Sequence, residues 1–221
     1  ADALALWAAN YLELPTSRQG LADAGLNATP IEALRGVPLM PEAKRSFDGT
    51  IVGCQKALKD HAGFAPVIHW IDVSEDLAGR LDQLTECFAR VFLANARDTL
   101  TAIVFVHGVT GAAALRPILP YIEERTAAAA VKYVWQAGCG LFAAFATSHN
   151  LNADQTRPID PASREKWIDR AVAGGDDHVI KFTATCLDEF DRGGSQTFLR
   201  AIRLAHQILQ PENLCESSRD K

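Results

Sequence analysis

Apolar residues recur three or four positions apart along most of the chain, which is the spacing of a helix rather than the alternation of a strand. The clearest example starts after Ser74-Glu75-Asp76, an N-cap followed by acidic residues. Its apolar positions are Leu77, Leu81, Leu84, Phe88, Val91 and Phe92, which predict a helix to about Asn95. Further helices are predicted at residues 3–14, 41–59, 123–147, 162–172, 177–190 and 196–210. The pattern therefore favours an all-α fold.

Residues 99–109 are almost continuously apolar and leave two interpretations open, a strand buried on both faces or a buried helix. The helical patterns on both sides favour a buried central helix. Glycine and proline break residues 16–41, which predicts an irregular connection with short turns, and residues 148–162 form a polar loop. No internal repeat divides the chain. We therefore expect one irregular multi-helix domain over residues 1–221, packed around the central helix.

Composition narrows the classes of function that remain. The chain has 48 % hydrophobic and 22 % charged residues and a net charge of −5, so it suits a folded protein that lacks the basic stripe of a nucleic-acid binder. No stretch combines the length and apolarity expected of a membrane span, so neither nucleic acid nor membrane is an expected partner. The five cysteines form no CxxC pair, which favours the cytoplasm. Because the chain starts with alanine, we expect part of the natural N-terminus to be missing.

Three histidines in apolar surroundings are the first candidates for chemistry: His69, His107 and His178. A buried imidazole must hydrogen-bond or bind a ligand, and each of the three taken singly fits an ordinary core residue. His61, near a predicted helix end, is a weaker candidate. Together with a lysine on the helix of His178, these histidines predict one metal or catalytic site.

That lysine is Lys181, three positions after His178 and therefore on the same helix face. Its ammonium has three alternatives: it reaches water along its apolar stem, pairs with a carboxylate, or occupies a dry site as the neutral amine. Only the neutral amine acts as a base or nucleophile, or captures carbon dioxide as a carbamate. A solvated lysine at a helix edge is the simpler interpretation.

The segment from His107 to Arg116 places small residues after a histidine, which leaves room for a ligand near the backbone. Arg116 is a candidate to hold an oxyanion or a phenolate. Alternatively, Gly108 and Gly111 serve only close helix packing. The sequence contains no GxGxxG, GxxxxGK[ST], HExxH or GxSxG motif, so a Rossmann-type cofactor site is not expected.

Three segments together resemble the questin oxidase-like family. They are Val106-His107-Gly108-Val109-Thr110-Gly111 with its continuation to Tyr121, Trp135-Gln136-Ala137, and Asp177-His178-Val179-Ile180-Lys181-Phe182. The resemblance covers about residues 60–205 and implies an oxygenase that acts on aromatic polyketides or quinones. It also implies a non-haem iron held by His107, His178 and a carboxylated Lys181.

We therefore expect a metal-dependent oxidoreductase of the monooxygenase or dioxygenase type. Its Fe(II) would be bound by His69, His107, His178 and Lys181, with His61 as a further ligand, and Lys181 and Arg116 would serve catalysis. The expected partners are dioxygen, a small aromatic substrate and further copies of the chain. Phe105, Trp135, Phe142 and Phe182 are candidates to line the substrate pocket. Two alternatives remain: metal-free catalysis with Lys181 as base and His178 as its partner, or a non-catalytic ligand-binding or oligomerisation domain that has lost part of the metal site.

Overall fold

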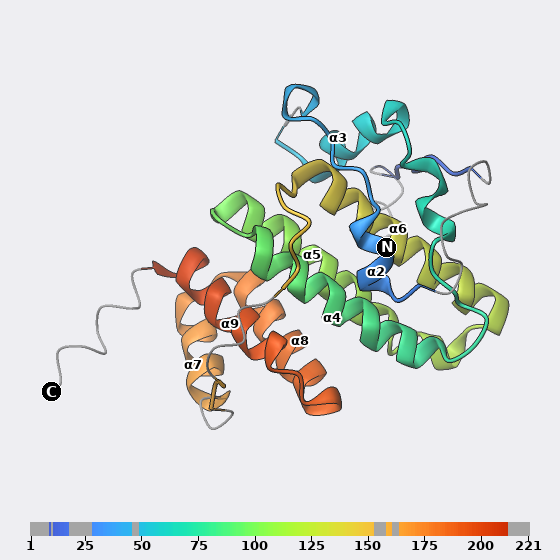
Figure 1. The fold of residues 1–221 in the computed structure, drawn as a ribbon. Helices are drawn as coiled ribbons and strands as arrows, with labels where there is room; N and C mark the ends of the chain where they lie inside the picture. The colour runs from blue at the N-terminus through green and yellow to red at the C-terminus, as the bar shows by residue number, and fades with distance from the viewer. Residues whose placement is uncertain are drawn as a thin grey trace, which may run out of the picture.

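A computed structural model describes residues 9, 11–17, 28–45, 49–152, 158–160 and 164–211. Within these ranges there is no strand, and Figure 1 shows the helices. The α-helices are α2 (Pro30–Arg35), α3 (Ile51–Lys56), α4 (Leu77–Asn95), α5 (Thr99–Leu115), α6 (Glu124–Phe145), α7 (Arg164–Gly174), α8 (Asp177–Gly193) and α9 (Gln196–Leu209). Short 3-10 turns are η1 (Glu42–Lys44), η2 (Ala57–Asp60), η3 (Ala65–His69) and η4 (Leu119–Tyr121). The all-α prediction is confirmed.

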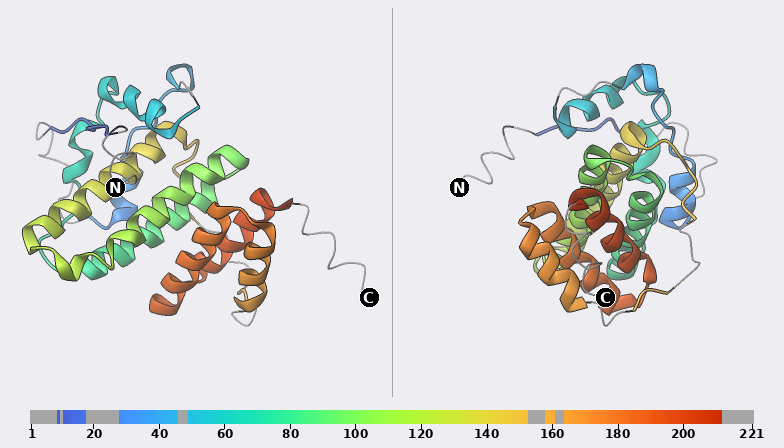
Figure 2. Two further views of the ribbon diagram at one scale, coloured as in Figure 1. Left: turned by 180° about the vertical axis from the view of Figure 1, so that it is seen from behind. Right: turned by 90° about the vertical axis from the view of Figure 1, so that its left-hand side faces the viewer.

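Three long helices, α4, α5 and α6, pack against one another at the centre of the molecule. The views of Figures 1 and 2 place α7, α8 and α9 together at one end of these three. The helices α8 and α9 contact both α4 and α5. On the other side, α3 and η3 pack on α6, and α2 packs on α4. Because α5 contacts α4, α6, α8 and α9, it is the central helix that the sequence predicted.

The contact between α4, α5 and α6 depends on one aromatic ring opposed by two glycines. The Phe88 ring on α4 lies 3.6 Å, at its Cγ, from the position that a Cβ on Gly108 would take, and a Cβ on Gly138 would overlap the ring. The same ring stacks near Trp135, with centroids 6.3 Å apart. The absence of a side chain at Gly138 therefore allows the close approach of α4 and α6.

Elsewhere the pattern predicted helices that the structure interrupts. Residues 11–14 are not helical, and residues 3–8 and 10 of the same predicted helix lie outside the described residues. The helix predicted over residues 41–59 is instead η1, α3 and η2, and residues 46–48 lie outside the described residues. Thr50 explains the late start of α3, because its side chain caps the helix at Gly53.

The aromatic residues expected to line a substrate pocket belong to the core instead. Phe105, Trp135, Phe142 and Phe182 are all at most 2 % exposed. Trp135 meets Phe88, and Phe182 on α8 meets Phe92 on α4 with ring centroids 4.8 Å apart. These rings join the helices to one another, so the expected pocket lining is corrected. Hydrophobic patterning alone does not separate a core aromatic from one that faces a cavity.

Four cysteines in the described part of the chain, Cys54, Cys87, Cys139 and Cys186, are buried. Burial raises the pKa of the thiols of Cys87, Cys139 and Cys186 well above the usual value. The fifth, Cys215, lies outside the described residues.

A buried polar cluster joins α7, α8 and α9 around His206, which is 2 % exposed. Nδ1 of His206 lies 3.0 Å from the amide oxygen of Gln210, and Nε2 lies 3.2 Å from the Thr183 hydroxyl. Because an amide oxygen only accepts, Nδ1 carries the proton and Nε2 accepts from Thr183. Burial, and secondarily the charge of Arg170, lowers the pKa of His206 to about 4.

This depressed pKa predicts a loss of stability in mild acid. Unfolded His206 gains a proton as the pH falls below its ordinary pKa of 6.5, whereas folded His206 stays neutral until about pH 4. The free energy of unfolding should therefore fall across this interval, by at most about 3 kcal/mol from this residue. Urea denaturation at several pH values measures the effect. His206→Gln, which cannot titrate, should flatten the curve between pH 6.5 and 4, and an unchanged slope would contradict this origin.

Candidate functional site

The structure brings together two of the predicted histidines, His107 on α5 and His178 on α8. Their ring centroids are 5.7 Å apart, and the ring planes are inclined by 61°. Two imidazoles bound to one metal ion have ring centres about 5 Å apart, because each metal–nitrogen bond is about 2.1 Å long. The observed separation is therefore close to that of a shared metal.

Carboxylates flank His178 because α8 begins with two aspartates. Asp176 is the N-cap and accepts hydrogen bonds from the backbone N–H groups of His178 and Val179. Nδ1 of His178 lies 3.3 Å from Oδ1 of Asp177 and 3.5 Å from Oδ1 of Asp176. This nitrogen is buried and has no hydrogen-bond partner of good geometry. One ligand atom from each of the three side chains lies within 4.8 Å of the others, which is compact enough for one cation.

His107 is held in an orientation that suits a metal ligand. Its Nδ1 lies 2.6 Å from the backbone carbonyl oxygen of Ile103, one helical turn earlier. Since a carbonyl can only accept, Nδ1 carries the proton and Nε2 keeps its lone pair. Histidines that bind metals commonly donate their other ring N–H to such a carbonyl. His107 is nevertheless exposed, which corrects the expectation that it is buried.

Lys181 does not occupy the dry site that a carbamate needs. Its side chain is 68 % exposed, and its Nζ pairs with Oδ2 of Asp177 at 2.6 Å. This is the carboxylate-paired alternative, four positions apart on one helix. The hydrogen bond from Lys181, with a smaller contribution from His178, lowers the pKa of Asp177. Asp177 is therefore an ionised oxygen donor beside the His178 imidazole. Among the described residues, the group of ligand atoms within 4.8 Å of one another comes from Asp176, Asp177 and His178 and does not include His107.

The other two predicted histidine ligands lie elsewhere. Nε2 of His61 lies 2.9 Å from the carbonyl oxygen of Pro38. His69 ends η3, which packs on α6, and Figures 1 and 2 place η3 on the side of the long helices opposite to α8. Among the described side chains, no group of three His, Cys, Asp or Glu ligands forms within 4.8 Å around either histidine. The four-histidine cluster expected from the sequence is therefore not assembled.

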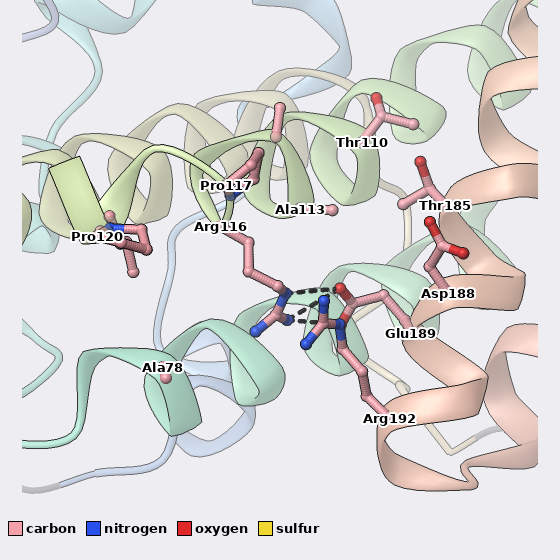
Figure 3. A pocket seen from close by; sticks show the side chains of 12 residues that line it. Ala78, Thr110, Ala113, Arg116, Pro117, Pro120, Thr185, Asp188, Glu189 and Arg192 are labelled. Atoms are coloured by element: carbon pink, nitrogen blue, oxygen red, sulfur yellow. Dashed lines mark hydrogen bonds and ion pairs between the residues drawn. The ribbon is translucent and has the colours of Figure 1, made fainter.

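Arg116 is engaged within the protein rather than offered to a substrate. Its Nε and Nη2 donate to both carboxylate oxygens of Glu189 at 2.8–3.0 Å, and Nη1 lies 2.9 Å from Oδ1 of Asp82. Glu189 is 4 % exposed and also accepts from the Thr85 hydroxyl at 2.7 Å. Figure 3 shows the bonds between Arg116 and Glu189, with the guanidinium of Arg192 next to that of Arg116. These side chains line a cleft of about 640 Å³ between α5 and α8.

A second cleft, of about 500 Å³, starts at His107 and runs between α5, α6 and α3. Its lining includes Gly108, Gly111 and Gly138. A side chain on Gly111 would enter open space, whereas Gly108 and Gly138 leave room for the Phe88 ring. The walls are mostly apolar, with Gln55 as the main other polar group. The lining residues are Ile51, Val52, Gln55, His107, Gly108, Gly111, Ala112, Val134, Ala137, Gly138 and Leu141.

No protein-family model, curated protein or solved structure matches this chain. The resemblance to the questin oxidase-like family therefore depends only on the short motifs around His107, Trp135 and His178.

Sequence reasoning missed Asp176, Asp177 and Glu189 as members of these two clusters. A signal for Asp177 was present, because an acid four positions before a lysine on a helix favours an ion pair. Glu189 gave no such signal, since its partner Arg116 lies 73 positions away in the sequence. Only the packing of α5 against α8 brings that pair together.

Proposed function

We propose that the protein is a metal-dependent oxidoreductase that binds a divalent first-row metal between α5 and α8. His107 and His178 would supply imidazole nitrogens, and Asp177 would supply the carboxylate oxygen. The observation that supports this proposal is the edge-to-face pair of imidazoles, with ring centroids 5.7 Å apart, together with the Asp177 carboxylate 3.3 Å from Nδ1 of His178. Two imidazoles and one carboxylate, which leave other coordination positions of the metal open, form a donor set typical of non-haem Fe(II) oxygenases.

Asp177 replaces the carbamate that the resemblance assigned to Lys181. An exposed, ion-paired lysine is poorly placed to capture carbon dioxide, whereas Asp177 already carries a carboxylate. In this arrangement Lys181 is a positioning residue, since its bond to Oδ2 leaves Oδ1 of Asp177 facing His178. The bond from His107 to Ile103 likewise fixes the imidazole tautomer.

The cleft beside His107 supports an apolar, aromatic small molecule as substrate. Its wall residues Ile51, Val134 and Leu141 offer apolar contacts, and Gln55 offers one hydrogen-bonding amide. A substrate there would lie against His107 and exclude water from that imidazole. A bound iron would supply dioxygen activation, and the chain's own residues would hold the substrate beside it.

Metal analysis after loading with Fe(II), or with Co(II) as an air-stable probe, tests this proposal. We expect about one ion per chain, with affinity reduced at least about tenfold by His107→Ala or His178→Ala, since each removes one of three ligands. His61→Ala is the matched control and should leave binding unchanged. Lys181→Ala distinguishes Asp177 from a carboxylated Lys181 as the oxygen ligand. Metal binding should weaken only modestly in this variant if Asp177 is the ligand. Equal binding by wild type, His107→Ala and His178→Ala would contradict the proposal.

A non-catalytic ligand-binding domain is the second candidate, and the exposure of His107 favours it. The edge-to-face contact of the two rings then stabilises the α5–α8 packing without any metal. Under this alternative, both histidine variants change stability and leave the metal content at the background level.

A further inference from the structure

The cleft of about 640 Å³ between α5 and α8, which we call the α5–α8 cleft, is separate from the site of the proposed function. Its described lining residues do not include His107, His178 or Asp177. Small-molecule sites commonly enclose about 300–1,000 Å³ and combine apolar walls with a few polar groups. The α5–α8 cleft has both kinds of wall, and each comes from a different helix.

The polar wall of the cleft is one face of α8. Thr185, Asp188 and Arg192 line it, and their spacing of three and four positions places them on the same side of the helix. In the part of the chain that the structure describes, none of these three side chains forms a hydrogen bond or an ion pair. An acid four positions before an arginine is the usual spacing of a helical ion pair, yet this pair is not formed. Both charges are therefore available to a ligand.

Figure 3 shows why the two charges on α8 do not meet. The guanidinium of Arg192 lies next to that of Arg116, whereas the carboxylate of Asp188 lies toward Thr185. The charge of Arg116 is already compensated, because this residue pairs with the buried Glu189. An unpaired cation and an unpaired anion thus remain at two separate points of the same wall.

Charges that border the cleft do not favour one sign over the other. Arg116 and Glu189 cancel, and Asp82, the second partner of Arg116, is exposed and does not line the cleft. Lys181 is the next charged side chain along this face of α8, and it is paired with Asp177 outside the cleft. A ligand with a single charge would satisfy either Asp188 or Arg192 and be repelled by the other. A ligand that carries both charges satisfies the two together.

The opposite wall consists of small and apolar side chains from α5 and the turn after it, among them Ala113, Ala114, Pro117 and Leu119. The helical stretch Thr99–Tyr121, which contains these residues, is long and apolar enough to cross a bilayer, although the sequence led us to expect no such stretch. Within the cleft this wall offers only apolar contact. It suits an aliphatic group on the ligand.

We propose that the α5–α8 cleft binds a free α-amino acid with an aliphatic side chain. Its carboxylate would accept hydrogen bonds from Arg192, its ammonium group would donate to Asp188, and its side chain would lie against Ala113 and Ala114. Four residues of a helix rise by about 6 Å. An amino acid that makes a bond of about 2.8 Å at each charged group bridges about 8 Å, which suits two side chains that diverge from such positions.

Calorimetric titration of the chain with L-leucine tests this proposal, after a chelating resin has removed metal ions. Two matched probes each lack one charge: 4-methylpentanoate has no ammonium group, and 3-methylbutylamine has no carboxylate. We expect leucine to bind at least about tenfold more tightly than either probe, because each probe leaves one charged side chain without a partner. No binding of leucine would overturn the proposal, and so would equal binding of leucine and either probe.

Variants of the polar wall identify which group of the ligand each residue binds. Arg192→Gln and Asp188→Asn should each weaken leucine binding at least about tenfold. Arg192→Gln should not weaken the binding of 3-methylbutylamine, and Asp188→Asn should not weaken that of 4-methylpentanoate. Arg203→Gln and Asp169→Asn are the matched controls, because both residues are exposed and neither lines the cleft.

The metal-site variant His178→Ala separates this inference from the proposed function. It should leave leucine binding unchanged, since His178 does not line the α5–α8 cleft. Loss of metal binding and loss of leucine binding are thereby measured independently. Equal affinity for leucine in the wild type, Arg192→Gln and Asp188→Asn would contradict the assignment of the cleft.

Discussion

Glu189→Ala is expected to lower the free energy of unfolding by about 3–5 kcal/mol, because it leaves a partly buried guanidinium without its partner. The side chain of Arg116 is 13 % exposed and donates three hydrogen bonds to Glu189. The Thr85 hydroxyl loses its acceptor in the same variant. Urea denaturation followed by circular dichroism measures the loss.

Two further variants establish the origin of this effect. Asp82→Ala removes the exposed carboxylate from the same arginine and should cost less than about 1 kcal/mol. Replacing both charged partners, as in Arg116→Met with Glu189→Leu, should recover much of the stability lost in Glu189→Ala, because no unpaired charge remains. A Glu189→Ala variant as stable as Asp82→Ala would show that solvent reaches the guanidinium.

Trp135→Ala is expected to cost about 3–5 kcal/mol, since it removes the largest fully buried side chain of α6. The indole packs near Phe88 and fills the centre of the α4–α6 contact. Its Nε1 also donates to the Val67 carbonyl oxygen at 2.7 Å, which connects η3 to α6. Thermal and urea denaturation measure the loss of stability.

The conservative variant Trp135→Phe separates these two contributions. It retains most of the buried ring but leaves the Val67 carbonyl without a donor, at a cost of about 1–3 kcal/mol. Native-state hydrogen exchange should then show earlier opening of residues in η3 than in α4. If η3 and α4 opened together in both variants, the indole hydrogen bond would not be what attaches η3.

Helix positions were predictable from the sequence where the spacing of apolar residues and the helix caps indicate the same boundaries. The apolar spacing of α4 predicted its extent to about Asn95, but its N-cap is Asp76 rather than Ser74. Asp176 and Ser195 cap α8 and α9, which the apolar pattern had also predicted as helices. The helix predicted over residues 41–59 failed because local caps divide that segment, with Thr50 starting a new helix. The strand alternative for residues 99–109 persisted because α5 is apolar on every side, which removes the periodicity that identifies a helix.

The candidate site was predictable only in part, because burial and long-range pairing are properties of the packed molecule. The sequence predicted His107, His178 and Lys181 as site residues and placed the last two on one helix face, and the structure brings His107 from α5 beside His178. It could not show that His107 is exposed, since an apolar neighbourhood in sequence gives no direction in space. Nor could it show that Arg116 is already satisfied by Glu189.

The burial of Cys54, Cys87, Cys139 and Cys186 has a consequence for chemical probing of the chain. Thiolates, not thiols, attack alkylating reagents, and the raised pKa values of Cys87, Cys139 and Cys186 keep these groups protonated. Modification of these three must therefore await separation of the helices that enclose them. Because Cys87, Cys139 and Cys186 lie on α4, α6 and α8, their individual labelling rates would time the opening of three different parts of the core.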